Sequence, residues 1–179
     1  RQVTVAEVEM HLRDPQTIAR GELQRLVEAV TVNAELARAS ARVVQTVVAG
    51  RRVTDDDTLE LAKMVFRGKI NTEILSQFRR RGIQAVGISG IDGGIITAKK
   101  RPPKDVLNAE TGETKMIDFG HVGDVVQVNV DLINTMLNNG YLPIISSLAA
   151  DDDGRIFNIN ADTIAVEIAA GLQAEKVIL

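Results

Sequence analysis

Cysteine and tryptophan are absent from the 179-residue sequence, and Tyr141 is its only tyrosine. Without cysteine the chain can form neither disulfides nor thiolate metal sites, and it has no thiol nucleophile. Aromatic residues make up only 3% of the sequence, so a platform of stacked aromatic side chains for single-stranded nucleic acid is not expected. These absences exclude cysteine-based catalysis and argue against nucleic acid as a partner.

The sequence also lacks a strong charge imbalance and a membrane-length apolar run. Its 21 basic and 24 acidic residues give a formal net charge of -3, which provides no basic field for nucleic acid. No signal-like leader is recognisable, so we expect no membrane contact and a cytoplasmic location. Because 45% of the residues are hydrophobic and the length suits one domain, the chain can bury a substantial core.

Glycine is scarce in the first 50 residues, where it occurs only at Gly21 and Gly50. A loop that surrounds a phosphate with backbone N–H groups needs several glycines, so none is expected there. Apolar residues recur in this region at intervals of three and four, between Leu23 and Val47, which is typical of helices. We therefore predict a helical N-terminal region over residues 1–50, ending at the second glycine.

Helical and extended patterns alternate along residues 51–179. A helix is predicted after a cap at Thr54 or Asp55, with a break at Gly68 before a second run. The segment G-I-D-G-G follows an apolar strand but leads into another β-branched run, so we interpret it as a hairpin rather than a phosphate loop. Further strands are predicted over residues 83–89, 141–148 and 155–160. A helix is predicted over residues 130–139. This alternation favours an α/β fold with a mostly parallel sheet flanked by helices.

Residues 157–165, F-N-I-N-A-D-T-I-A, combine three polar groups with the start of a helix. In an extended strand Asn158, Asn160 and Asp162 share one face. Apolar residues recur at helical spacing from Ile164 onward, which predicts a helix that begins between Asn160 and Asp162. Polar groups at a helix N-terminus are typical of an anion site, and Asn and Asp are also common helix caps. The spacing alone leaves both interpretations open.

Several motifs follow one another over residues 51–179 in a specific order. They are R-V-T-D-D-D-T-L-E-L-A-K-M-V-F-R-G-K-I-N, G-I-S-G-I-D-G-G, G-H-V-G, D-L-I-N-T-M-L-N-N-G-Y-L-P-I-I-S-S-L and D-G-R-I-F-N-I-N-A-D-T-I-A. This series resembles the N-acetylglutamate kinases of the amino acid kinase family, and N-I-N-A-D is its most selective part. The resemblance implies that residues 51–179 form part of an amino acid kinase-like fold, as its substrate-binding domain.

The resemblance also implies an activity and a set of site residues. That activity is ATP-dependent phosphorylation of the side-chain carboxylate of N-acetyl-L-glutamate in arginine biosynthesis, with Mg²⁺ accompanying ATP. Arg52 matches the residue that binds the substrate's α-carboxylate, a role suited to a bidentate donor. Asn158 matches a residue that hydrogen-bonds the substrate, and Asp162 matches the catalytic carboxylate that orients lysines. Asn160 keeps the capping role. A homo-oligomer is implied as well.

Two parts of the family pattern have no counterpart in the sequence, namely the first glycine-rich loops and the nucleotide-binding half. Cofactor-binding residues are therefore not assigned. One interpretation is an acetylglutamate kinase that retains part of the amino acid pocket. The alternative is a non-catalytic ligand-binding or assembly domain on the same scaffold. Within the enzyme interpretation, a related acylated amino acid such as N-acetyl-aminoadipate is the alternative substrate.

Overall fold

The computed structural model describes residues 46–48, 51–107, 112–175 and 177. Most of the helical region expected over residues 1–50 lies outside this part of the chain. Thr46–Val48 form strand β1, which pairs antiparallel with β2 (Arg51–Val53). The helix predicted as far as Val47 is therefore wrong at its end, because the β-branched run T-V-V favours a strand once a partner is available. The division of the chain at residue 50 stays a prediction.

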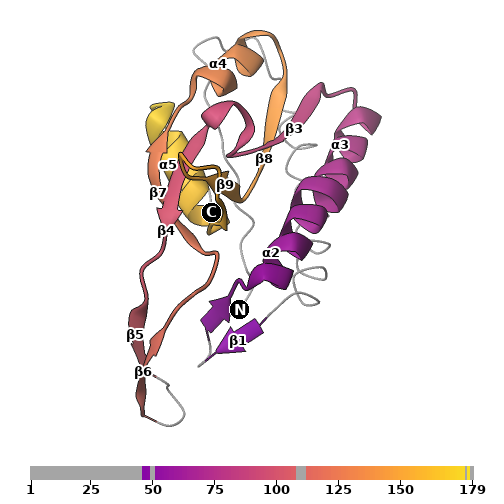
Figure 1. The fold of residues 1–179 in the computed structure, drawn as a ribbon. Helices are drawn as coiled ribbons and strands as arrows, with labels where there is room; N and C mark the ends of the chain where they lie inside the picture. The colour runs from indigo at the N-terminus through magenta and orange to yellow at the C-terminus, as the bar shows by residue number, and fades with distance from the viewer. Residues whose placement is uncertain (1–45, 49–50, 108–111, 176, 178–179) are drawn as a thin grey trace.

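A long helical rod crosses the molecule diagonally (Figure 1). It is built from α2 (Asp56–Ala62), the π-helical segment η1 (Lys63–Ile70) and α3 (Asn71–Arg80). The predicted break at Gly68 is wrong, since Gly68 lies inside η1 and the rod continues through it. A glycine within a helix costs about 1 kcal/mol relative to alanine, and packing of the rod on its neighbours outweighs that penalty. Asp55 caps the rod by accepting a hydrogen bond from the Thr58 N–H at 2.8 Å.

The strands of the described residues form small sheets of mixed direction. One sheet pairs β3 (Ala85–Ser89) in parallel with β8 (Leu142–Ser146). The largest sheet has the order β10-β9-β4-β7, in which β4 is parallel to β9 and the other pairs are antiparallel. Its strands are β4 (Ile96–Lys100), β7 (Gly123–Val128), β9 (Leu148–Ala150) and β10 (Ile156–Asn158). The predicted α/β class is confirmed, and antiparallel pairs accompany the parallel ones.

The hairpin predicted around G-I-D-G-G is wrong. β3 and β4 do not pair with each other, because β3 pairs with β8 and β4 pairs with β7 and β9. Between them lies the short 3₁₀ segment η2 (Asp92–Gly94), whose Asp92 carboxylate accepts hydrogen bonds from the N–H and hydroxyl of Ser89. The glycines therefore close a compact side-chain-capped turn that sends the chain into a different sheet.

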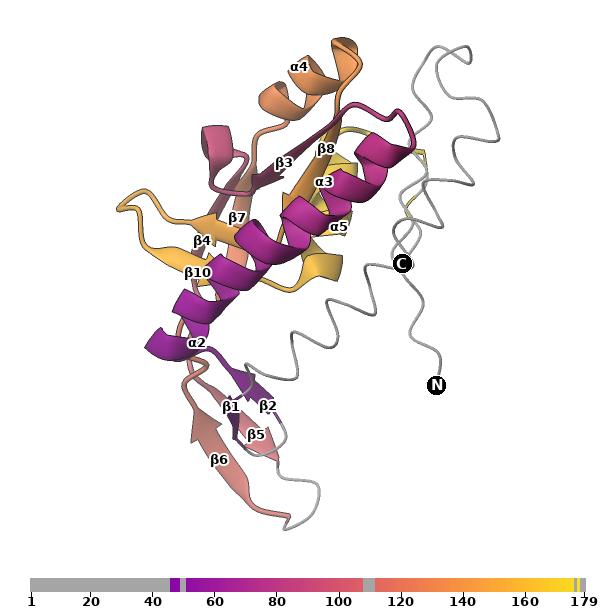
Figure 2. The same ribbon diagram turned by 90° about the vertical axis from the view of Figure 1, so that its right-hand side faces the viewer.

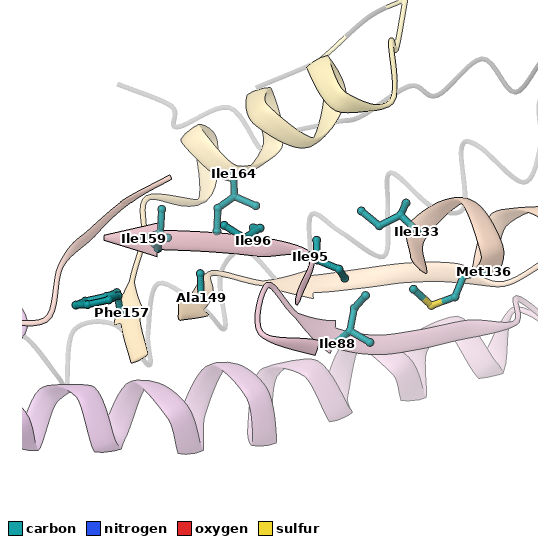
Figure 3. Close-up of a cluster of buried hydrophobic side chains, with 10 residues drawn as sticks. Ile88, Ile95, Ile96, Ile133, Met136, Ala149, Phe157, Ile159 and Ile164 are labelled. Carbon is teal, nitrogen blue, oxygen red and sulfur yellow. The ribbon is translucent and has the colours of Figure 1, made fainter. Parts of the chain in front are cut away.

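Helices cover the sheets on more than one side, and the larger of two clusters of buried apolar side chains lies between them. The rod segment α3 packs on β3 and β8, while α4 (Asp131–Asn138) packs on β8 and α5 (Ala161–Gly171) packs on β7 (Figure 2). Figure 3 shows side chains of the larger cluster, which come from β3, β4, α4, β9, β10, α5 and the segments between them. This larger cluster consists of Ile88, Ile95, Ile96, Ala98, Ile133, Met136, Ala149, Phe157, Ile159 and Ile164. The smaller cluster consists of Leu59, Ala62 and Leu148. The predicted helix over residues 130–139 and the predicted start of α5 are both confirmed.

A hairpin of β5 (Lys104–Leu107) and β6 (Thr114–Ile117) projects away from the helices and from the largest sheet in both views (Figures 1 and 2). Its two strands contact each other more than any other part of the chain. Among the described residues, no helix has the length and apolar content needed to cross a membrane.

Candidate functional site

Three chain segments that are distant in the sequence meet beside the end of β10. The N–H of Thr54 donates to the carbonyl of Phe119 at 3.0 Å, and the carbonyl of Thr54 accepts from the N–H of His121 at 2.6 Å. The carbonyl of His121 in turn accepts from the N–H of Asn158 at 2.8 Å. We call this arrangement of Thr54, residues 119–122 and Asn158 the three-segment junction. It fixes the backbone of Asn158 relative to the segment that follows β2.

Gly120 makes the close approach within the junction possible. Its φ of +68° lies in the left-handed region, which L side chains rarely adopt. A Cβ atom at this position would lie 2.1 Å from the carbonyl oxygen of Thr54. A side chain at residue 120 would therefore push the Thr54 segment away from residues 119–122.

The side chains of Asn158 and Thr54 also meet in the junction. The Nδ2 group of Asn158 donates to the Oγ1 atom of Thr54 at 3.3 Å. Thr54 is 3% exposed, so its hydroxyl is buried against the end of β10, whereas Asn158 is half-buried. In the part of the chain that the structure describes, no other group hydrogen-bonds the Asn158 amide. Its carbonyl oxygen and its second N–H are therefore available to a ligand.

His121 links the junction to the start of the helical rod. Its Nε2 atom lies 2.6 Å from an oxygen of Asp56, which is in the first turn of α2. Together with its two backbone hydrogen bonds, this contact gives His121 a structural role. The described residues contain no group of three acidic or histidine side chains that could hold a metal ion.

The two other polar residues of N-I-N-A-D lie at the start of α5. The Oδ1 atom of Asn160 accepts hydrogen bonds from the N–H groups of Asp162 at 2.7 Å and Thr163 at 3.3 Å. Asn160 is thus the N-cap, as predicted, and it occupies N–H groups that an anion would otherwise use. The carboxylate of Asp162 is exposed in the first helical turn and has no partner among the described residues. It is free to interact with a cation.

Arg52 lies in β2, where its backbone is opposite Val47, two residues before Thr54. The description of this residue is limited to its backbone. The structure therefore brings Asn158 to the segment that carries Arg52, and it places Asp162 four residues after Asn158. Contacts of the guanidinium group with either residue stay a prediction.

A surface hollow of about 620 Å³ adjoins the junction without containing the predicted site residues. It is lined by Gly120 and His121 on the junction side, but not by Arg52, Asn158 or Asp162. Three of its cations already have carboxylate partners: Lys63 with Glu60, Lys100 with Asp118 and Arg155 with Asp151. The hollow is open to solvent, and most of its cationic side chains are paired with carboxylates. We therefore do not identify this hollow with the substrate site.

Several N–H groups of the glycine-rich turn over residues 87–94 are already used within the turn. The N–H of Ser89 donates to Asp92, the N–H of Gly94 donates to Ile91, and the N–H of Ile96 donates to Gly90. Burial raises the pKa of Asp92, but hydrogen bonds from Ser89 and the guanidinium of Arg67 outweigh it and hold that pKa below its usual value. An ionised carboxylate at the centre of the turn is unfavourable for a phosphate beside it, and the interpretation of this turn as something other than a nucleotide loop stays a prediction.

Comparison with known proteins places this chain in the amino acid kinase family. The sequence pattern of that family matches residues 17–179, and the chain belongs to it. Among curated relatives, the chain is similar to the acetylglutamate kinases of Methanothermobacter thermautotrophicus and Methanocaldococcus jannaschii, with 46% and 47% identity over 132 residues. These alignments cover 74% of this chain and 45% and 43% of the relatives. The chain therefore spans less than half the length of these curated relatives.

Solved structures share the fold at lower identity. The structure of smu.665 from Streptococcus mutans has a TM-score of 0.59 and 25% identity, and the match covers 81% of this chain and 54% of that one. N-acetylglutamate synthase from Neisseria gonorrhoeae has a TM-score of 0.58 with 20% identity, over 88% of this chain and 37% of that one. The second likeness shows the fold alone.

The role of Thr54 in the site was missed at the level of sequence. The pattern placed Thr54 only as a possible helix cap, but Asp55 takes that role and leaves the threonine hydroxyl for Asn158. The available signal was the position of Thr54 in R-V-T, two residues after the predicted carboxylate ligand Arg52. Its partner lies too far along the chain for spacing to reveal it.

Proposed function

We propose that this chain forms the amino acid-binding part of a cytoplasmic kinase that phosphorylates the side-chain carboxylate of N-acetyl-L-glutamate with ATP, in arginine biosynthesis. The observation that carries the proposal is the 46% identity over 132 residues to an acetylglutamate kinase. The three-segment junction supports it, because it positions a half-buried amide with unpaired hydrogen-bonding groups beside the Arg52 segment.

The proposed roles follow the chemistry of the side chains. Arg52 binds the α-carboxylate of the amino acid, because a planar guanidinium can donate two parallel hydrogen bonds to it. Asn158 hydrogen-bonds the substrate through the amide groups that Thr54 leaves free. Asp162 is an anion and would repel a phosphoryl group, so it acts by orienting lysine side chains that neutralise the transferred charge. The proposal includes assembly as a homo-oligomer.

Among the described residues, neither the glycine-rich turn nor the acidic side chains form an evident site for ATP or its Mg²⁺. The glycine-rich turn over residues 87–94 uses several of its N–H groups internally, and the described part of the chain contains no group of three acidic or histidine side chains that could hold a metal ion. We therefore assign these residues to the amino acid and not to the nucleotide. This same observation favours a second candidate function, a non-catalytic domain that binds the acylated amino acid without transferring phosphate.

A carboxyl kinase assay on the full-length protein distinguishes the two functions. The product of the kinase is an acyl phosphate, which hydroxylamine converts to a stable hydroxamate that can be measured. We expect ATP-dependent hydroxamate formation with N-acetyl-L-glutamate, and slower formation with N-acetyl-aminoadipate or free glutamate. Binding of N-acetyl-L-glutamate in calorimetry without any product would support the non-catalytic domain. Absence of both would refute the proposal.

Replacement of Arg52 tests the proposed carboxylate contact. We expect Arg52→Ala to weaken binding of N-acetyl-L-glutamate by about ten- to a hundredfold, because a hydrogen bond to a charged group contributes roughly 1.5–3 kcal/mol. Arg51→Ala is the matched control, since it removes the same charge one residue earlier and should leave the dissociation constant nearly unchanged. If both substitutions changed the dissociation constant equally in calorimetry, Arg52 would not be a substrate contact.

A further inference from the structure

We propose that Thr54 is a positioning residue for the amino acid substrate, which it serves by holding the amide of Asn158 in one orientation through its hydroxyl. This inference rests on the proposed function and deepens it, since it identifies the group that prepares the Asn158 amide for binding. The Thr54 side chain need not touch the substrate.

The contact between the two side chains divides the Asn158 amide into an occupied half and a free half. One Nδ2 hydrogen is used by the Thr54 hydroxyl at 3.3 Å. The carbonyl oxygen and the other hydrogen keep no partner among the described residues, on a side chain that is half-buried. A hydrogen bond on one side of an amide fixes its rotation, so the free half presents a defined donor and acceptor pair. Fixing that rotation before binding lowers the entropy lost when a ligand binds.

The Thr54 hydroxyl is itself held in place by the backbone. Thr54 is 3% exposed, and its N–H and carbonyl are bonded to Phe119 and His121, respectively. Because Gly120 permits a close approach, this segment cannot shift without breaking both bonds. The hydroxyl therefore behaves as a fixed reference point for the Asn158 side chain. The same short segment carries Arg52, so one element sets the positions of both proposed substrate contacts.

A purely structural role for the buried hydroxyl makes a different prediction. If Thr54 only satisfies a buried amide hydrogen, its removal lowers the stability of the fold but leaves ligand binding unchanged. If Thr54 positions Asn158 for the substrate, its removal weakens binding only while Asn158 is present. A double-mutant cycle separates these cases, because coupling appears only between groups that act together.

The experiment measures the dissociation constant of N-acetyl-L-glutamate by calorimetry in the full-length protein. The variants are Thr54→Val, which keeps the shape without the hydroxyl, Thr54→Ser, which keeps the hydroxyl, Asn158→Ala, and Thr54→Val combined with Asn158→Ala. We expect Thr54→Val to weaken binding roughly two- to tenfold, in line with the loss of one hydrogen bond. Thr54→Ser should stay within about twofold of the wild type. In the Asn158→Ala background, Thr54→Val should have no further effect.

Each outcome bears on the inference. Unchanged binding by Thr54→Val, or an equal loss in both backgrounds, would overturn the positioning role and leave the proposed function intact. A wild-type protein that does not bind N-acetyl-L-glutamate would refute the proposed function, and with it this role. If Thr54→Val does not fold, Thr54→Ala takes its place in the cycle. In steady-state kinetics, the KM for N-acetyl-L-glutamate should rise while the KM for ATP stays constant.

Discussion

Asn160 shows how one side chain determines where a helix starts. Its backbone is extended, with φ of −63° and ψ of 126°, and its Oδ1 atom accepts hydrogen bonds from two N–H groups of the first turn of α5. These N–H groups have no acceptor within the helix. The cap supplies one, so the N–H groups do not stay unpaired when the helix forms. Two residues later, Asp162 places a negative charge near the positive end of the helix dipole.

Removing this cap should destabilise the fold measurably. We expect Asn160→Ala to lower the free energy of unfolding by about 1 kcal/mol. Asn160→Asp should keep most of the stability that the cap contributes, because aspartate is also a good N-cap. Urea denaturation followed by circular dichroism provides the measurement. Asn138→Ala is the control, since Asn138 is exposed in the last turn of α4 and its side chain caps nothing in the described structure. An equal loss in both alanine variants would show that the cap contributes no stability of its own.

The sequence predicted the cap but not the junction, and the reason is the range of the interactions. The Asn160 contacts span two and three residues, so local preference indicated a cap in this stretch as one of two interpretations. The contact between Thr54 and Asn158 joins residues that are 104 positions apart, and no periodic pattern encodes it. The predicted roles of Arg52, Asn158 and Asp162 came from resemblance, and they stay predictions.

At the scale of elements, a tertiary ion pair determines the path of the chain after β3. Arg67 from η1 donates to the carbonyl of Gly87 at 2.9 Å and reaches Asp92 at 3.3 Å. Asp92 also accepts two hydrogen bonds from Ser89. The glycines of this turn favoured a hairpin when the sequence was considered alone, but a helix far from it in the chain supplies the cation that stabilises a different turn.

This arrangement predicts an acid-sensitive step in stability. Because the folded-state pKa of Asp92 is lowered from its ordinary value of 3.8, the carboxylate contributes stability above that pH and loses the contribution as the pH falls through the lowered pKa. We therefore expect Asp92→Asn to be less stable than the wild type at neutral pH and to lose less stability between neutral pH and about pH 3. Thermal melts across this range provide the measurement.

Asp105→Asn is the control for the acid experiment. Asp105 lies on the exposed hairpin and forms no ion pair with the described residues. Its replacement should leave the dependence of melting temperature on pH close to that of the wild type. A parallel pH dependence for Asp92→Asn and the wild type would contradict the assignment of this step to Asp92.

At the scale of the whole molecule, the projecting hairpin contributes to stability unevenly along its length. In β6, Met116 is 72% exposed, whereas the next residue, Ile117, is 4% exposed. Adjacent residues of one strand therefore differ greatly in burial. We expect Met116→Ala to change the free energy of unfolding by less than about 0.5 kcal/mol, and Ile117→Ala to lower it by about 2–4 kcal/mol. Denaturant titration of the pair tests this contrast. Similar losses in both variants would show that Met116 is covered in the folded protein.

The α/β class could be predicted for the whole molecule, but the strand order could not. Long-range pairing decides whether an apolar run such as that of β8 joins a parallel or an antiparallel partner, and the pattern along one strand is the same in both cases. The run predicted over residues 141–148 became two strands, because β8 pairs with β3 and β9 pairs with β10 and β4. The periodicity of the helices, in contrast, was sufficient to locate α2, α4 and α5.

The three-segment junction has a consequence for the order of folding. Its side-chain contact closes a loop of 104 residues, and the entropy of closing such a loop is lost before the contact stabilises anything. The helical rod and the β5–β6 hairpin depend on local contacts and can form early, whereas the junction must form late. Amide exchange of Asn158, whose N–H is bonded to the carbonyl of His121, should therefore require global unfolding. The proposed substrate site then exists only in chains that have finished folding, which prevents partly folded intermediates from binding the amino acid.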